Sequence, residues 1–144
     1  MSSASTSPTP TPETAEILGI PLAICDYTEV MDWMDATIAA DGRGYLTAAA
    51  VNLVMAAQED PAARAAVLGA TLAVPDGMPL VWALRALGHA NATRVYGPDL
   101  MANYCARAAA AGAAGARIYL YGGRDQSALE LYESDVGAPY RIAS

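Results

Sequence analysis

Short apolar runs alternate along the chain with segments in which apolar residues recur at helical spacing. The short runs have the length of buried strands, and the recurring pattern is that of helices that bury one face. In residues 29–40, EVMDWMDATIAA, the apolar residues on one predicted helical face are Val30, Trp33, Met34 and Ile38. The hydrophobic pattern therefore predicts strands and helices in turn.

The predicted strands are residues 17–25, 45–47, 71–74 and 117–121, and residues 94–96 are predicted to be a brief extended piece. The predicted helices are residues 29–40, 48–58, 61–70, 78–87, 100–112 and 125–133. Thr28 and Asp99 are predicted N-caps. Pro61 suits a first helical turn, and Gly88 suits a position just after a helix. This order predicts an α/β fold, with a Rossmann-like, mostly parallel sheet flanked by helices in three α/β/α layers.

The two ends of the chain differ from this pattern. Residues 1–14 are rich in Ser, Thr and Pro and predict a disordered tail, so the α/β domain is expected to span residues 15–144. The tail has neither the basic nor the apolar part of a signal peptide, and no apolar run is long enough to span a bilayer. We therefore expect a cytoplasmic protein, with docking on the inner membrane face left open.

Charge and cysteine content narrow the possible functions. The net charge of −7 argues against nucleic-acid binding, which needs a basic face, although a local Arg could still hold one diphosphate. Cys25 and Cys105 lie in apolar runs and are interpreted as buried reduced thiols, with a disulfide or a metal site as the alternatives. A single histidine, His89, leaves little from which to build a metal site, so none is predicted.

Asp76 and Gly77 stand where a parallel sheet would bind a ligand, beyond the carboxyl end of a predicted strand. A carboxylate at this place can face a pocket and accept a proton from a sugar hydroxyl. The same two residues also fit a simple turn in which Asp76 caps the next helix. The residues alone leave both interpretations open.

Other candidate positions are equally open to two interpretations. Gly122 and Gly123 follow a predicted strand and could let the backbone approach a phosphate, but a plain tight turn fits them as well. Arg94 could neutralise a diphosphate or form a surface salt bridge. Trp33 and Trp82 are interpreted as core residues rather than platforms for a sugar ring.

Three blocks of sequence, VPDGMPLVWALRALG, RVYGPDLM and IYLYGG, resemble the WecG/TagA/CpsF glycosyltransferases. The segment before the first block fits the same family, so the resemblance covers residues 17–123. Its specificity comes from a Pro-Asp-Gly motif followed, at a suitable distance, by Arg-x-x-Gly-x-Asp-Leu. The resemblance makes Asp76 the first candidate for a catalytic residue.

The resemblance implies an inverting, metal-independent enzyme that needs no cofactor. Such an enzyme transfers a sugar, often N-acetylmannosamine, from a UDP-sugar to an undecaprenyl-diphosphate-linked acceptor in cell-wall or exopolysaccharide synthesis. It also implies homo-oligomers and contact with the inner membrane face. Asp76 would be the general base, and Arg94 would hold the anionic substrate. The substrate-binding positions implied with Arg94 are Gly77, Gly97, Asp99, Gly122 and Gly123.

The sequence departs from the family pattern at two places. The family commonly has Thr-x-Asn after its second strand, and a gapless count from Asp76 puts these positions on Ala48 and Ala50. The nearby Thr47 and Asn52 are candidates for the same substrate-binding role. A later Gly-x-Pro-Lys-Gln-Glu-like loop and a C-terminal Arg-containing segment are not found, which predicts an α/β domain that is incomplete at its C-terminus.

Two alternatives to a transferase are a non-catalytic binding module and a dehydrogenase. A domain that is incomplete could be an inactive remnant that binds a nucleotide or a partner subunit. A generic dehydrogenase is disfavoured, because no GxGxxG motif follows the first predicted strand.

Overall fold

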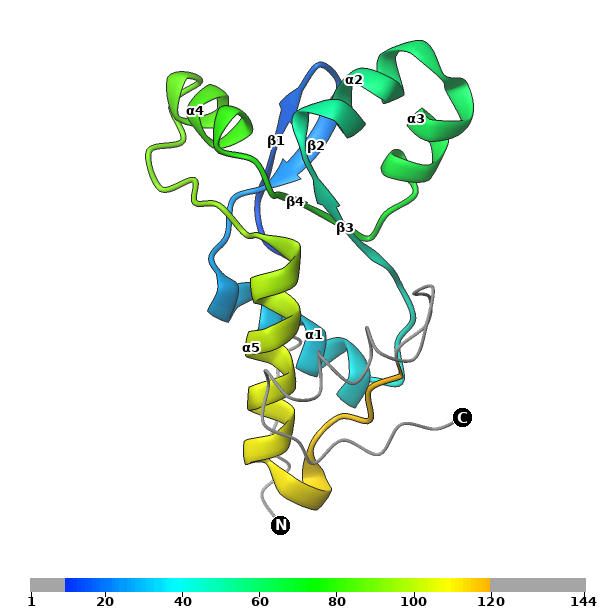
Figure 1. Ribbon diagram of the computed structural model, residues 1–144, viewed down its shortest axis with the longest axis vertical. Coiled ribbons are helices and arrows are strands. Elements are labelled where there is room, and N and C mark those ends of the chain that lie inside the picture. Colours follow the sequence, from blue (N-terminus) through cyan, green and yellow to red (C-terminus); the bar gives the residue numbers. More distant parts are fainter. Residues whose placement is uncertain (1–9, 120–144) are drawn as a thin grey trace, which may run out of the picture. The chain divides into compact units, whose positions relative to one another are not determined.

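The computed structural model of the chain describes residues 10–119, and Figure 1 shows its elements. The strands are β1 (Thr14–Ile17), β2 (Ile20–Ala23), β3 (Leu46–Ala49) and β4 (Leu72–Pro75). The helices are α1 (Tyr27–Ala39), α2 (Val51–Glu59), α3 (Pro61–Leu68), α4 (Met78–Ala86), α5 (Gly97–Ala110) and a short 3-10 helix (Gly112–Ala114). The chain divides into two compact units, residues 1–97 and residues 98–144.

Strands β3 and β4 form a parallel pair, in register from Leu46 opposite Leu72 to Ala49 opposite Pro75. Parallel neighbours need a long crossover connection, and helices α2 and α3 supply it. Helices flank this parallel pair, which confirms the predicted α/β class and is consistent with a three-layer α/β/α arrangement.

The apolar run at residues 17–25 folds differently from the single strand that its pattern predicts. Strands β1 and β2 form an antiparallel hairpin in which Ile17 pairs with Ile20. The two residues between them, Leu18 and Gly19, have φ angles of 51° and 77°. Two consecutive positive φ angles define a type I′ turn, whose twist matches that of the flanking strands. The single-strand prediction is therefore wrong.

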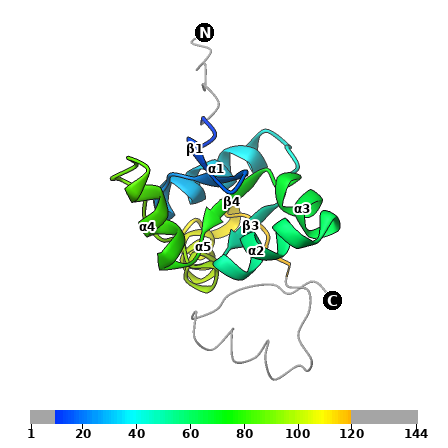
Figure 2. The same cartoon turned by 90° about the horizontal axis from the view of Figure 1, so that it is seen from above.

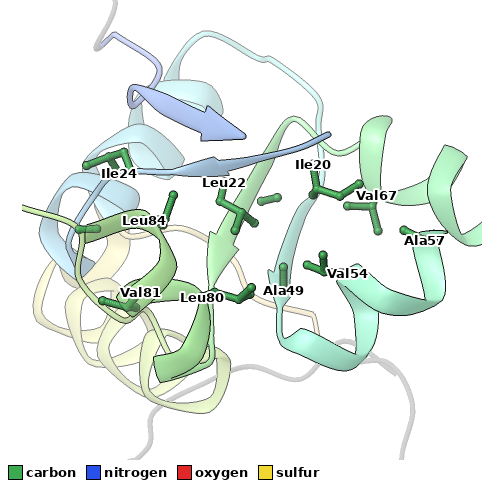
Figure 3. Packing of buried hydrophobic residues seen from close by; sticks show 12 residues of the cluster. Ile20, Leu22, Ile24, Ala49, Val54, Ala57, Val67, Leu80, Val81 and Leu84 are labelled. Carbon is green, nitrogen blue, oxygen red and sulfur yellow. The ribbon is translucent and has the colours of Figure 1, made fainter. Parts of the chain in front are cut away.

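The hydrophobic core of the first unit lies between strands β1–β4 and helices α2, α3 and α4. Figure 2 shows α4 on one side of β4 and α2 with α3 on the other. Figure 3 shows the buried side chains gathered between them. The core residues are Ile20, Leu22, Ile24, Ala49, Val54, Ala57, Val67, Ala73, Leu80, Val81, Leu84 and Ala92.

The start of α1 corrects one predicted cap. Asp26, not Thr28, is the N-cap: its Oδ1 accepts from the Glu29 N–H at 2.8 Å. The Glu29 carboxylate accepts in return from the Asp26 N–H, also at 2.8 Å. This reciprocal capping box satisfies two N–H groups at the helix start. On the face predicted to be apolar, Val30 and Trp33 are buried, whereas Ile38 is exposed.

The two tryptophans have different environments. Trp33 is 8% exposed, as predicted for a core residue, but Trp82 is 60% exposed, so its assignment to the core is wrong. The segment MPLVWALRA of α4 is apolar on almost every side. Its pattern therefore does not select the face that meets the sheet.

The predicted ends of several helices and strands can be compared with the observed elements. Pro61 does stand in the first turn of α3, where Asp60 is the N-cap, and Gly88 does follow the end of α4. Asp99 is a residue of the first turn of α5 and not its cap. Residues 117–119 have irregular backbone instead of the predicted strand. The predicted helix 125–133, the end of that strand and most of the predicted tail lie outside the described residues.

A candidate active site at the end of strand β4

Asp76 directly follows β4, and its backbone continues the parallel ladder. Its N–H donates to the carbonyl oxygen of Ala49 at 2.9 Å. The N-cap of α4 is Gly77, and no side chain caps this helix. The Asp76 carboxylate is therefore not used as a helix cap, which removes the simple-turn interpretation. It projects from the carboxyl end of a parallel strand, the position where α/β sheets bind ligands.

Two groups hold the Asp76 carboxylate in place. Oδ2 accepts from the Gly97 N–H at 3.2 Å, and Oδ1 lies 3.7 Å from Nη2 of Arg94. The Asp76 side chain remains 18% exposed. A carboxylate that is oriented by a backbone amide and still reaches solvent can meet a substrate hydroxyl.

Arg94 is fixed on three sides. Its Nε donates to the backbone carbonyl of Asp76, its Nη2 faces the carboxylate, and its guanidinium carbon lies 4.4 Å from the centre of the Tyr96 ring. The side chain is nevertheless 43% exposed. Stacking on an aromatic ring and a forked set of donors are properties that suit Arg to an anion site. The sequence alternative of a surface salt bridge describes only part of these contacts.

The backbone around Arg94 lies along the end of β4 without forming a regular strand. The Val95 N–H donates to the Pro75 carbonyl at 2.9 Å, so this segment extends the edge of β4 opposite β3. The prediction of a brief extended piece at 94–96 agrees with this arrangement. The segment brings Arg94 to the same sheet end as Asp76, although their hydrogen bond spans 18 positions of sequence.

Small residues surround the Asp76 carboxylate. A Cβ atom added at Gly97 would stand 3.2 Å from Cβ of Ala48 and 3.5 Å from Oδ2 of Asp76. A Cβ atom added at Gly77 would stand 4.0 Å from Cα of Ala50. Ala48 and Ala50, the positions reached by the gapless count, therefore border the site.

A sequence model of the "Glycosyl transferase WecG/TagA/CpsF family" matches residues 15–138 of the chain. The chain belongs to the WecG/TagA/CpsF glycosyltransferase family. A search of curated proteins found no match. The family match includes Asp76 and Arg94, and it makes glycosyl transfer the class of reaction for the chain.

The other substrate-binding residues predicted for the family have different locations. Thr47 precedes Ala48 on β3 and lies on the opposite face of that strand, together with the core residue Ala49. Asn52 is exposed in the first turn of α2, where its Oδ1 accepts from the Leu53 N–H at 2.9 Å. Within residues 10–119, neither side chain makes a hydrogen bond or an ion pair with Asp76. The roles of Thr47 and Asn52 stay predictions.

Asp99, Gly122 and Gly123 are the remaining positions predicted to bind substrate. Asp99 lies in the first turn of α5, in the unit that begins at Pro98. Gly122 and Gly123 lie outside the described residues. For all three residues, a role in substrate binding stays a prediction.

Sequence analysis missed two residues that support the site. The Tyr96 N–H donates to the hydroxyl oxygen of Tyr27 at 3.0 Å, and Oγ1 of Thr93 donates to the Cys25 carbonyl at 2.8 Å. Cys25 lies between β2 and α1, and Tyr27 is the first residue of α1, so both are far in sequence from the residues that they bind. No local pattern indicates such contacts, because a tyrosine in the first turn of a helix predicts no particular backbone partner.

The cysteines are buried thiols, as predicted. Both lie in the described part of the chain, and neither is a disulfide partner. Burial, reinforced by the negative charges of Glu29 and Asp26, raises the pKa of the Cys25 thiol to about 12. A thiol that stays protonated is a poor nucleophile and a poor metal ligand, so Cys25 supports the fold and not the chemistry.

Among the described residues there is neither a candidate metal site nor a membrane-spanning helix. Within residues 10–119, no group of three or more His, Cys, Asp or Glu side chains is arranged to hold a metal ion. In the same range, no helix is both long and apolar enough to cross a bilayer.

Proposed function

We propose that this glycosyltransferase moves a sugar, such as N-acetylmannosamine, from a UDP-sugar to an undecaprenyl-diphosphate-linked acceptor. The observation that carries the proposal is the Asp76 carboxylate at the end of β4, held by the Gly97 amide and accompanied by Arg94. A base and a cation at one sheet end match the two needs of the reaction. The acceptor hydroxyl must lose a proton, and the diphosphate must leave as an anion.

In this mechanism Asp76 takes the proton of the acceptor hydroxyl as that oxygen attacks the anomeric carbon. The new glycosidic C–O bond forms while the bond from the anomeric carbon to the UDP oxygen breaks. UDP leaves with that electron pair, and a single displacement inverts the anomeric configuration. Asp76 must then pass its proton to solvent before the next turnover, which its partial exposure permits.

Arg94 is proposed to stabilise the departing diphosphate. Charge that develops on a leaving group is stabilised most by donors that are already oriented. Arg94 meets this condition, because its contacts with Asp76 and Tyr96 fix its orientation while much of its side chain stays exposed. We further propose that protein donors of this kind replace a metal ion, with Gly122 and Gly123 contributing on the nucleotide side.

The lipid-linked acceptor implies where the reaction takes place. An acceptor with a polyprenyl chain stays in the bilayer, so we propose a cytoplasmic enzyme that works as a peripheral protein at the inner membrane face. Homo-oligomers are part of the same proposal. The reaction would serve cell-wall or exopolysaccharide synthesis.

The experiment is a transfer assay with UDP-, GDP- and CDP-linked sugars, a short-chain lipid-diphosphate-sugar acceptor, and a chelator or an added divalent ion. We expect turnover with UDP-sugars alone, unchanged by the chelator, and a product whose anomeric configuration by NMR is inverted. A retained configuration, or activity that depends on the added ion, would contradict the proposed mechanism. Donor binding by calorimetry without any turnover would instead support the nucleotide-binding module that the sequence left open.

A further inference from the structure

The hydroxyl of Tyr27 binds the backbone of Tyr96, which stands between Arg94 and Gly97 in the sequence. It accepts the Tyr96 N–H at 3.0 Å, and the next amide along the chain, that of Gly97, donates to Oδ2 of Asp76 at 3.2 Å. The Tyr96 ring lies beneath the guanidinium of Arg94, 4.4 Å from its carbon to the ring centre. A single hydrogen bond therefore holds Tyr96, whose ring contacts the cation Arg94 and whose neighbour Gly97 donates to the base Asp76.

The acceptor side of this hydrogen bond is itself rigid. Tyr27 is the first residue of α1, directly after the N-cap Asp26. The capping box between Asp26 and Glu29 satisfies two N–H groups there, so the first turn of α1 is well defined. The Tyr27 hydroxyl is thus presented from a fixed helix start.

A second hydrogen bond joins the same two parts of the chain. Oγ1 of Thr93 donates to the carbonyl of Cys25 at 2.8 Å. Thr93 and Tyr96 lie on either side of Arg94, and Cys25 and Tyr27 lie on either side of Asp26. The segment that carries Arg94 is therefore attached at two points, to Cys25 in the connection after β2 and to Tyr27 at the start of α1.

We infer that Tyr27 is a positioning residue, which acts through Tyr96 and Gly97 to set the orientation of Asp76 and Arg94. The inference rests on the proposed function for its catalytic consequence, but its structural part stands on the hydrogen bonds alone. Without the hydroxyl, the Tyr96 amide has lost its acceptor and its peptide can rotate. That rotation moves the Gly97 amide away from the carboxylate and the ring away from the guanidinium.

The test compares Tyr27→Phe with Tyr45→Phe in the full chain. Tyr45 is the matched control, because its hydroxyl also binds the backbone, at the carbonyl of Ala66, away from Asp76. The first readout is the ¹H–¹⁵N NMR signal of the Gly97 amide, whose chemical shift reports its hydrogen bond to the Asp76 carboxylate. We expect this signal to keep its wild-type position in Tyr45→Phe and to move in Tyr27→Phe.

The second readout is kinetic. Loss of a positioned base should lower kcat about tenfold in Tyr27→Phe and leave kcat unchanged in Tyr45→Phe. A Gly97 signal at its wild-type position in folded Tyr27→Phe would overturn the inference. If Tyr27→Phe does not fold, Thr93→Val removes the neighbouring attachment and should also move the Gly97 signal; a signal at the wild-type position would overturn the inference equally. The NMR result stands apart from the proposed function, which fails separately if Asp76 variants keep full turnover.

Discussion

Gly97 and Ala48 lie so close together that a Cβ atom added at position 97 would stand 3.2 Å from the Cβ atom of Ala48. The same added atom would stand 3.5 Å from Oδ2 of Asp76. The small size of residues 48 and 97 is thus what lets the Gly97 amide reach the carboxylate. A larger side chain at residue 48 or 97 would therefore be expected to displace the carboxylate of Asp76, the proposed base.

Gly97→Ala is expected to lower the free energy of unfolding by about 1–3 kcal/mol, because the added methyl overpacks against Ala48. Alanine is otherwise the better helix former, so a net loss would isolate the clash. Urea unfolding of Gly97→Ala, Ala48→Gly and the double variant measures the coupling. We expect the double variant to lose about 1 kcal/mol less than the sum of the single losses. Strict additivity would show that the two residues do not compete for space.

Arg94→Lys keeps the positive charge but is not expected to keep its function. Lysine has one compact donor group and cannot at once bind the Asp76 carbonyl, face the carboxylate and stack on Tyr96. We predict that kcat/KM for the nucleotide-sugar falls about tenfold. Arg43→Lys, at an exposed arginine in the loop after α1, is the matched control and should leave kcat/KM unchanged. A wild-type kcat/KM in Arg94→Lys would contradict the proposed role of Arg94 in stabilising the diphosphate.

Leu18→Asn should stabilise the protein, although it removes an apolar side chain. Leu18 has a φ angle of 51° in the hairpin turn and is 58% exposed, so it loses little burial and bears backbone strain. Asparagine tolerates the left-handed region and is favoured before glycine in type I′ turns. We expect a gain of about 0.5–1 kcal/mol in the free energy of unfolding. Leu18→Ile, with a β-branched side chain, should be destabilising, and the opposite order of the two variants would refute the turn assignment.

The raised pKa of Cys25 predicts a loss of stability in alkali. The folded-state pKa of about 12 lies above the ordinary value of 9.0, so the folded chain favours the protonated thiol. Its contribution to stability is fully present below pH 9.0 and declines as the pH rises towards 12, by at most about 1.4 kcal/mol per pH unit. Unfolding free energies of the wild type and Cys25→Ala, measured below and within this window, should converge as the pH rises. A constant difference between them would contradict the assignment.

The order of helices α1–α5 and the position of Asp76 beyond a strand could be predicted from the sequence. The strand before Asp76 is a short apolar run that ends in Pro-Asp-Gly, and β4 forms there. Because ligand sites in parallel sheets lie beyond strand ends, the position of Asp76 followed from local pattern and topology. Arg94 followed from the family motif, and the structure places it beside Asp76.

Three features could not be predicted from local sequence patterns: the hairpin turn, the exposed face of α4 and the contact of Tyr27 with Tyr96. The sequence does not predict the hairpin because Leu18 is not a usual residue for a positive φ angle, and Gly19 and Pro21 alone interrupt the apolar run of residues 17–25. Trp82 was assigned wrongly because α4 is apolar on nearly all sides. Tyr27 was missed because its partner is a backbone amide 69 positions away.

The central claim is that Asp76 is the general base of glycosyl transfer, and Asp76→Asn tests it most directly. The amide has the same shape and can still accept the Gly97 N–H, but it cannot take a proton from the acceptor hydroxyl. Glu59→Gln, the same chemical change at an exposed position at the far end of α2, is the matched control. The measurement is the rate of transfer with saturating UDP-sugar and acceptor. The account predicts that kcat falls about 100-fold or more in Asp76→Asn and is unchanged in Glu59→Gln, whereas an Asp76→Asn variant with wild-type kcat would contradict it.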